Sequence, residues 1–297
     1  MRARSKFILT RTGQTLDLDE THVEQRARTF EPPFVGGPMG KMGCFYRWMI
    51  AGFACAFLTG CQIAPSAERY GKIFYLDGAG NWGDGAEGVA SGVFAAGFQG
   101  DVEEYVWTTS YNPLVDQLNL SAARMRSKQL ADKIRRYRSR YPDAPVHVVA
   151  LSAGTGVATW AIEQLEDDSK IDHFVLLGSS LSHDYDLSAA LEKMRGNIYV
   201  YYSPHDVVLE AVRTIGTIDG KRGVESIGYV GVDVPEGLES RIFNTPWSRD
   251  WLKYGWTGAH QDCVNAYFVR FEIARKILPI SQVGDTRLAS YTAQPEF

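Results

Sequence analysis

One serine lies where an apolar run gives way to small residues. Ser152 falls within the segment 148–156, Val-Val-Ala-Leu-Ser-Ala-Gly-Thr-Gly, and a helical pattern follows it. This pattern predicts a strand that turns sharply into a helix. A serine in such a turn can present its hydroxyl above the sheet only if the residues two before and two after it are small. Ala150 and Gly154 meet that condition, so Ser152 is a candidate nucleophile.

A nucleophilic serine needs a base, and the base needs a carboxylate that orients it. Asp206 follows the apolar run 197–202 and comes 54 residues after Ser152, and His260 comes another 54 residues later. His260 is the only histidine after Asp206. We therefore expect His260 to be the base and Asp206 the acid. Asp184, which follows the preceding apolar run, is the main rival for the acid.

The other histidines have structural explanations. His147 and His173 each begin a predicted strand, and His205 precedes the candidate acid, while His183 is a candidate for the mouth of the site. A phosphate-binding loop at 150–156 is disfavoured because the segment lacks the lysine of GxxxxGK[ST] and the spacing of GxGxxG. A tight turn with an idle serine remains the plain alternative.

These motifs resemble the nucleophile elbow and the triad order of the α/β-hydrolase family, with Ala150 in place of the first glycine of G-x-S-x-G. The resemblance covers roughly residues 70–278. It implies an α/β-hydrolase fold, a mostly parallel sheet with helices on both faces. It also implies a serine hydrolase that cleaves carboxylic esters, in the manner of an esterase or lipase, through an acyl-enzyme. Thioester and amide substrates stay open, and no metal or organic cofactor is implied.

The family resemblance also implies an oxyanion hole of two backbone N–H groups. One belongs to Ala153, directly after the nucleophile. The other should come from Gly78-Ala79-Gly80-Asn81, where we choose Ala79 and keep Gly80 as the alternative. Asp77 stands where the family often has histidine, and the plain alternative is that these glycines only make a tight turn.

Alternating apolar runs and helical patterns predict the elements that position these residues. We expect strands at 72–77, 104–108, 146–151, 173–177 and 197–202, and helices at 88–98, 122–141, 188–194 and 261–278. Glycine-rich residues 214–231 suggest loops or strand edges. The short segment between Gly178 and Gly196 leaves no room for a large cap domain, so the site should be open. Trp247, Trp251 and Trp256 are candidates for an apolar wall beside it, although tryptophans at such spacing more often belong to a core.

Composition limits the class of protein. The chain has 297 residues, 45% hydrophobic and 22% charged, which is typical of a soluble globular protein, and one large domain is the simplest interpretation. Its net charge of −4 disfavours a nucleic-acid partner. Three of the four cysteines lie between residues 44 and 61, which gives neither a disulfide framework nor a zinc spacing.

The first 60 residues differ from the rest. Residues 1–41 show no sustained apolar period and suggest an unstructured stretch or an over-extended reading frame, with Met39 or Met42 as the true start. Residues 42–60 resemble a bacterial lipoprotein signal peptide, since an apolar run after Arg47 ends in Leu-Thr-Gly-Cys at 58–61. The resemblance implies lipidation of Cys61, a tether at 61–69, a hydrolase domain at 70–278 and a tail at 279–297. A buried helix with a chance LTGC is the alternative.

Together these observations predict a lipid-anchored ester hydrolase of the bacterial cell envelope, facing the periplasm or the exterior. Its partners would be a small-molecule or lipid ester substrate and, through the lipid anchor, the membrane. A second hypothesis is a catalytically silent, lipid-anchored surface protein that uses the same fold for binding. Labelling by a fluorophosphonate separates the two hypotheses because it requires an activated serine.

Overall fold

The apolar runs form the strands of one sheet. The structure, a computed structural model, describes residues 66–279. All neighbouring strands there run parallel, in the order β2-β1-β3-β4-β5-β6. Their bounds are β1 (Lys72–Leu76), β2 (Asp101–Glu104), β3 (Val146–Leu151), β4 (His173–Leu177), β5 (Ile198–Tyr202) and β6 (Ile242–Pro246). The central strands are buried on both faces, which explains why their sequences do not alternate between apolar and polar residues.

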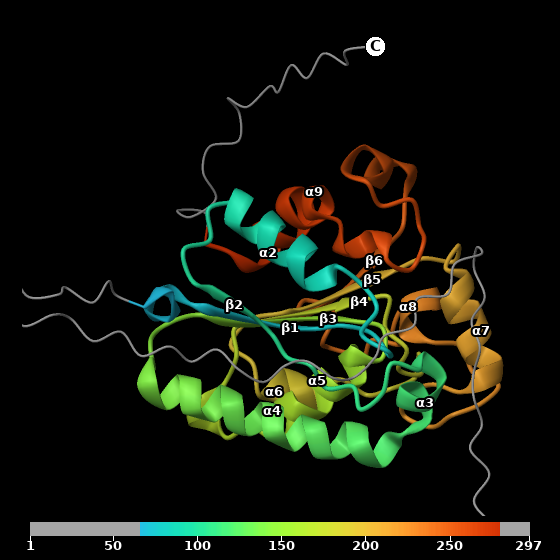
Figure 1. Ribbon diagram of the computed structural model, residues 1–297, viewed down its shortest axis with the longest axis horizontal. Coiled ribbons are helices and arrows are strands. Elements are labelled where there is room, and N and C mark those ends of the chain that lie inside the picture. Colours follow the sequence, from blue (N-terminus) through green and yellow to red (C-terminus); the bar gives the residue numbers. More distant parts are fainter. Residues whose placement is uncertain (1–65, 280–297) are drawn as a thin grey trace, which may run out of the picture. The chain divides into compact units, whose positions relative to one another are not determined.

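Helices cover both faces of this sheet (Figure 1). One face carries α4 (Leu120–Arg140), α5 (Gly154–Glu163) and α6 (Ser188–Glu192). The other carries α2 (Gly85–Ala95), α9 (Ala266–Phe268), a π-helical turn at Val269–Ile273 and α10 (Ala274–Ile277). Near the ends of the strands lie α3 (Pro113–Leu118), α7 (Val207–Ile215) and α8 (Ile227–Val230). Short 3₁₀ turns occupy Ala67–Tyr70, Asp167–Ser169, Arg249–Tyr254 and Asp262–Val264.

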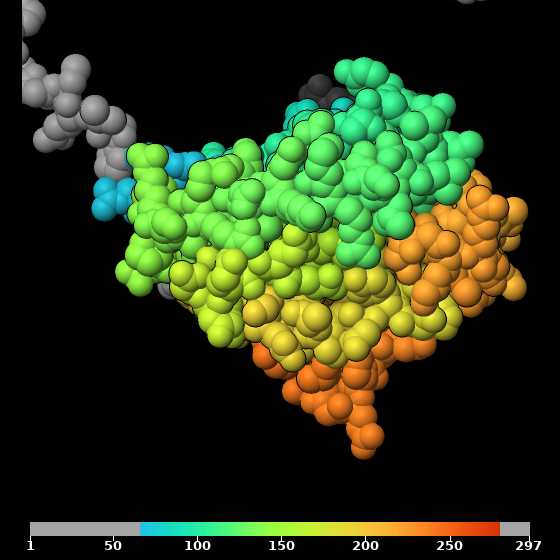
Figure 2. Space-filling view, turned by 90° about the horizontal axis from the view of Figure 1, so that it is seen from below, coloured from blue at the N-terminus to red at the C-terminus, as the bar shows by residue number. Residues whose placement is uncertain are grey.

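The strand side chains divide into two apolar layers. Phe74 and Leu76 belong to the layer under α4, α5 and α6, while Ile73 and Tyr75 belong to the layer under α2 and the C-terminal helices. Viewed from below, α4 appears in green along the molecule, with the orange segment of α7 at its right-hand end (Figure 2). The apolar stripe of α4 faces the sheet and most of its basic residues lie on the outer side, as an amphipathic helix requires. Arg138 is the exception, since it is buried and pairs with Asp172.

The parallel sheet with helices on both faces and the sharp turn from β3 into α5 constitute the α/β-hydrolase fold, so the expected fold class is confirmed. Between β4 and β5 the chain forms only the short helix α6. The expectation that this connection holds no large cap domain is confirmed as well.

Some element predictions are wrong in detail. β2 covers residues 101–104 instead of 104–108, because its register with β1 ends at the pair Tyr75 and Glu104, and Trp107 lies in the core beyond the strand. The helix expected at 261–278 is divided into a 3₁₀ turn, α9, the π-helical turn and α10. β6, α3 and α7 were not predicted from the sequence.

Residues 1–65 and 280–297 lie outside the described part of the chain. The predicted signal peptide, Cys61 and most of the tether therefore remain predictions. Within residues 66–279, no helix is both long enough and apolar enough to cross a membrane.

His147 has an unusual environment for a histidine. It lies on β3, is almost fully buried, and stacks on His173 of β4 with ring centroids 5.4 Å apart. Both of its ring nitrogens are buried and make no hydrogen bond. Burial lowers the pKa of His147 to about 3, because the apolar surroundings disfavour the charged imidazolium.

We predict that His147 makes the fold sensitive to acid. Its pKa in the folded protein lies below the ordinary value near 6.5, so the unfolded chain binds its proton first as the pH falls. The free energy of unfolding should therefore drop by roughly 2 kcal/mol between pH 6.5 and 4.5 on account of this residue. Urea titrations at several pH values should show a weaker acid dependence for His147→Phe than for the natural protein. His205→Gln, at an exposed histidine, should leave that dependence unchanged.

Candidate active site

Ser152 occupies the turn between β3 and α5. Its φ is 52°, and within residues 66–279 only one other residue besides glycine, Asn81, has a positive φ. This left-handed conformation is strained for a serine and is a common feature of functional turns. Gly154 is required here, since a side chain at this position would collide with the carbonyl oxygens of Leu76 and Asp77. The predicted need for a small residue two positions after Ser152 is thus observed at Gly154. Ala150, two positions before Ser152, is fully buried.

Asp206 and His260 meet at the C-terminal side of the sheet. The Oδ2 atom of Asp206 lies 2.7 Å from Nδ1 of His260, and both side chains are largely buried. The other oxygen, Oδ1, accepts hydrogen bonds of 3.0 Å from the N–H groups of Val208 and Leu209 and so caps α7. Because Asp206 is held from two sides, it can fix the orientation of the imidazole.

Gly178 forms the floor beneath this pair. It follows β4 with a φ of 47°, and a methyl group added to it would lie 3.4 Å from Nδ1 of His260 and 3.6 Å from Oδ2 of Asp206. These distances are ordinary contacts, so it is the positive φ, and not a lack of space, that favours glycine at this position.

Ser152 and His260 line the same cavity, which has a volume of about 540 Å³. No hydrogen bond between Ser152 and His260 is formed in the described part of the chain. Catalytic hydrogen bonds are often long without substrate and tighten when it binds. The structure thus brings Asp206 into contact with His260 and places Ser152 and His260 in the lining of one cavity.

Two buried carboxylates hold the loop that follows β1. Asp77 accepts hydrogen bonds from the N–H groups of Gly78 and Gly83 and from the hydroxyl of Tyr75. Asp116, from α3, accepts the N–H of Gly80 at 3.2 Å. Burial raises the pKa of the Asp77 carboxyl above its usual value, while its hydrogen bonds oppose that shift. The backbone of this loop is therefore held from both ends.

These hydrogen bonds distinguish among the candidate oxyanion donors. The N–H groups of Gly78 and Gly80 are occupied by carboxylates. Within residues 66–279, the N–H groups of Ala79 and Ala153 donate no hydrogen bond to the protein. Ala79 also lines the cavity that contains Ser152. The geometry thus leaves the N–H of Ala79 available and engages that of its alternative, Gly80.

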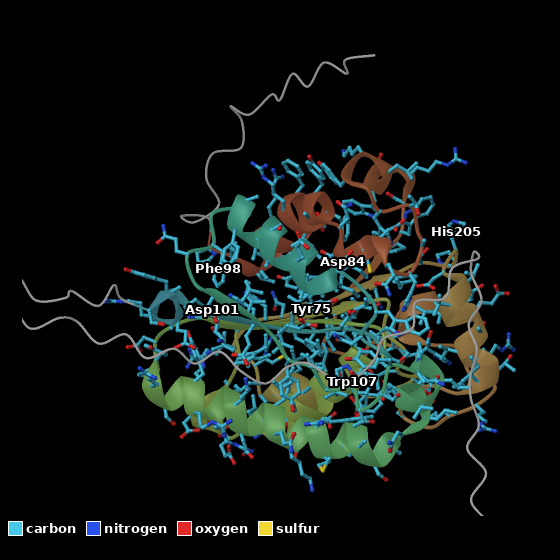
Figure 3. The ribbon with its side chains drawn as sticks, in the orientation of Figure 1. Tyr75, Asp84, Phe98, Asp101, Trp107 and His205 are labelled. Atoms are coloured by element: carbon cyan, nitrogen blue, oxygen red, sulfur yellow. The ribbon has the colours of Figure 1, made fainter. Side chains whose placement is uncertain are left out.

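The rival acid and the remaining histidines lie in other contacts. Asp184 is exposed and pairs with Lys221 at 2.7 Å, which lowers the pKa of its carboxyl. His183 pairs with Asp233 at 3.1 Å. His205 packs edge-on against Trp247 and lies at the right-hand edge of the molecule (Figure 3). None of these residues lines the cavity of Ser152.

The expectation of a tryptophan wall from Trp247, Trp251 and Trp256 is wrong. All three pack in the apolar layer beneath the C-terminal helices, where Trp256 contacts Tyr201 and Phe268. Their spacing reflects burial in the core. The tryptophan at the cavity is Trp82, which is 70% exposed and donates from its indole to the carbonyl oxygen of Tyr111.

Sequence reasoning missed the helices that wall the cavity. α3 contributes Leu114 and Gln117, and α7 contributes Val208, Ala211, Val212 and Ile215. A signal for α3 was present in the sequence, since Asn112 followed by Pro113 is a typical cap and first position of a helix. α7 carries a similar signal in Asp206, since aspartate is a typical helix cap as well as a candidate acid.

A second cavity, of about 590 Å³, lies next to the first and shares Trp82 and Gln261 with it. Its lining is more polar and includes Asp84, which lies at the start of α2 (Figure 3). In residues 66–279, no group of three or more His, Cys, Asp or Glu side chains is placed to hold a metal ion. Cys263 is buried beneath His260, and burial raises the pKa of its thiol well above the usual value, so it is not a reactive thiolate.

Comparisons with known proteins give structural similarities only. No protein-family model and no curated protein sequence matches the chain. Among solved structures, lipase B of Aspergillus fumigatus is 12% identical with a TM-score of 0.42, and the match covers 66% of this chain but only 50% of the lipase. A cutinase-like protein from Cryptococcus sp. is 15% identical with a TM-score of 0.36, covering 69% of this chain and 88% of the other. RedJ is 12% identical with a TM-score of 0.34, covering 70% and 86%. Similarity at this level assigns neither a substrate nor a residue's role.

Proposed function

We propose that this protein is a serine hydrolase that cleaves carboxylic esters. The observation that carries the proposal is the strained turn at Ser152, whose side chain shares a cavity with a histidine that is already paired to a buried carboxylate. A strained nucleophile beside an oriented base is the arrangement that acyl transfer needs.

In this mechanism Oγ of Ser152 attacks the ester carbonyl carbon while His260 takes the hydroxyl proton. Asp206 holds Nδ1 of His260 in its protonated tautomer, which leaves Nε2 free to act as the base. The carbonyl oxygen becomes an oxyanion that accepts hydrogen bonds from the N–H groups of Ala79 and Ala153. His260 then gives its proton to the departing alcohol, and water releases the acyl group from Ser152 by the same steps.

The first test is replacement of the nucleophile. Ser152→Ala should lower ester hydrolysis on the order of 10⁴-fold or more, because nucleophile and base act as a unit. The fold should persist, because folding depends little on this hydroxyl. Circular dichroism and the melting temperature check this expectation. The natural protein should react with a fluorophosphonate at Ser152, as mass spectrometry of the labelled peptide can show. A natural protein that neither labels nor hydrolyses any ester would instead support the silent binding protein.

A second test separates the two candidate acids. Asp206→Asn should lower kcat by about 10³- to 10⁴-fold, because an amide can favour the wrong tautomer of His260. Asp184→Asn, which removes only an exposed ion pair with Lys221, should change kcat less than about twofold. Steady-state kinetics on one ester decides between them. The opposite result would assign the acid to Asp184.

We further propose that the protein is anchored in the bacterial cell envelope through a lipid on Cys61. The proposal rests on the Leu-Thr-Gly-Cys ending of the apolar run, and the first described element begins only a few residues later, at Ala67. Several acyl chains, at about 0.8 kcal/mol per buried CH₂, would hold the protein on the membrane.

The anchor has a direct test. Cys61→Ser should abolish acylation at this position and move the protein from the membrane fraction to the soluble fraction, as mass spectrometry and fractionation can show. A chain beginning at Gln62 should still hydrolyse esters, because no triad residue lies near the anchor in the sequence. An unmodified Cys61 in membrane-extracted protein that still carries residues 1–60 would contradict the lipid anchor.

A further inference from the structure

We infer that the cavity beside Ser152 binds the acyl part of the ester and favours apolar chains longer than butanoyl. Ala211 of α7 would determine how much of a longer chain fits. This inference rests on the proposed ester hydrolysis and specifies its substrate class. It comes from the chemistry of the cavity wall.

The cavity wall is apolar and carries no formal charge. No Asp, Glu, Lys or Arg side chain lines it, and six of its fourteen lining residues are apolar residues of α3 and α7. The carbonyl oxygens of the two amides supplied by the α3 segment are already engaged. Asn112 caps α3, and Gln117 donates to the carbonyl oxygen of Gly216 and accepts from Ser180. A charged or sugar-like acyl group would find few free hydrogen-bond partners here to replace those it has in water. A hydrocarbon chain has no such hydrogen bonds to lose.

The volume of the cavity favours a long chain. About 540 Å³ is within the range of sites that enclose a drug-sized ligand. An acetyl group would fill a small part of this space and leave the aliphatic wall in contact with water. Each further methylene that leaves water for this wall should raise kcat/KM about threefold to fourfold.

One stripe of α7 forms much of the wall. Val208, Ala211, Val212 and Ile215 recur at the spacing of one helix face. Ala211 is the smallest of the four and is exposed on the helix. A larger side chain at Ala211 can therefore project into the cavity without displacing the core. A substitution at Ala211 can therefore change the preference for acyl chain length without a change in folding.

α7 also connects the wall to the triad. Its first turn is capped by Asp206, which binds His260 through its other oxygen. Val208, whose N–H donates to that cap, itself lines the cavity. A chain bound along α7 would consequently lie on the helix whose cap orients the base.

The experiment measures kcat/KM for p-nitrophenyl esters of acetate, butanoate and octanoate, each below its aggregation concentration. In the natural protein, kcat/KM should rise from butanoate to octanoate on the order of 100-fold. Ala211→Phe should lower the octanoate value on the order of tenfold and leave the acetate and butanoate values within about twofold. Thr214→Phe serves as the matched control. It is exposed on the same helix and does not line the cavity, so it should change none of the values.

Three results would overturn the inference. They are a flat or falling chain-length profile in the natural protein, an equal loss on all esters in Ala211→Phe, or the same change in Thr214→Phe. A binding measurement keeps the inference separate from the proposed reaction. Octanol should bind to Ser152→Ala protein by calorimetry and bind more weakly when Ala211→Phe is added. If octanol binds in this way while no ester is cleaved, the apolar site holds and the hydrolase proposal fails.

Discussion

The carboxylate of Asp206 carries two contacts on which the candidate site depends. One oxygen accepts two N–H groups at the start of α7, and the other binds Nδ1 of His260. The helix cap fixes the carboxylate, and the carboxylate in turn fixes the ring of a histidine that arrives from a distant loop. Gly178, whose positive φ favours glycine, lies directly beside this contact. Three separate segments of the chain therefore converge on the buried carboxylate of Asp206. They follow β4, β5 and the 3₁₀ turn at Arg249–Tyr254.

Buried carboxylates recur at the same end of the sheet for a related reason. The loop after β1 must keep an irregular backbone near Ser152, and irregular backbone leaves N–H groups without partners from secondary structure. Asp77 and Asp116 supply those partners, and each is about 1% exposed. Since hydrogen bonds to charged acceptors are stronger than neutral ones, the loop keeps its form although it contains three glycines. The same bonds engage the N–H groups on both sides of Ala79 and leave its own N–H unused.

The fold could be predicted from the sequence because its signals are local and strong. A strand buried on both faces must be continuously apolar, as Val146–Leu151 is, and the turn at Ser152 tolerates only small neighbours. The order of Ser152, Asp206 and His260 along the chain could also be read from the sequence. The contact between Asp206 and His260 could not, because it depends on a fold that brings distant segments together. Edge strand β6 was missed because its side chains are mostly exposed and carry no apolar pattern. The tryptophans were misplaced because an apolar residue in a core and one in a substrate site look alike in a sequence.

The walls of the cavity were hidden for a different physical reason. α3 has only six residues and α7 nine, so each depends on its cap and on packing more than on helix propensity. Their cavity-facing residues, such as Leu114 and Val208, are about half exposed, and exposed apolar residues in short helices resemble ordinary surface. Yet these two helices place an uncharged wall against Ser152 without any inserted domain between β4 and β5. Asp206 caps α7, so an acyl chain packed along this helix, as proposed, would contact the element that also orients His260. Under the proposed function, substrate selection and proton transfer would then share one structural support.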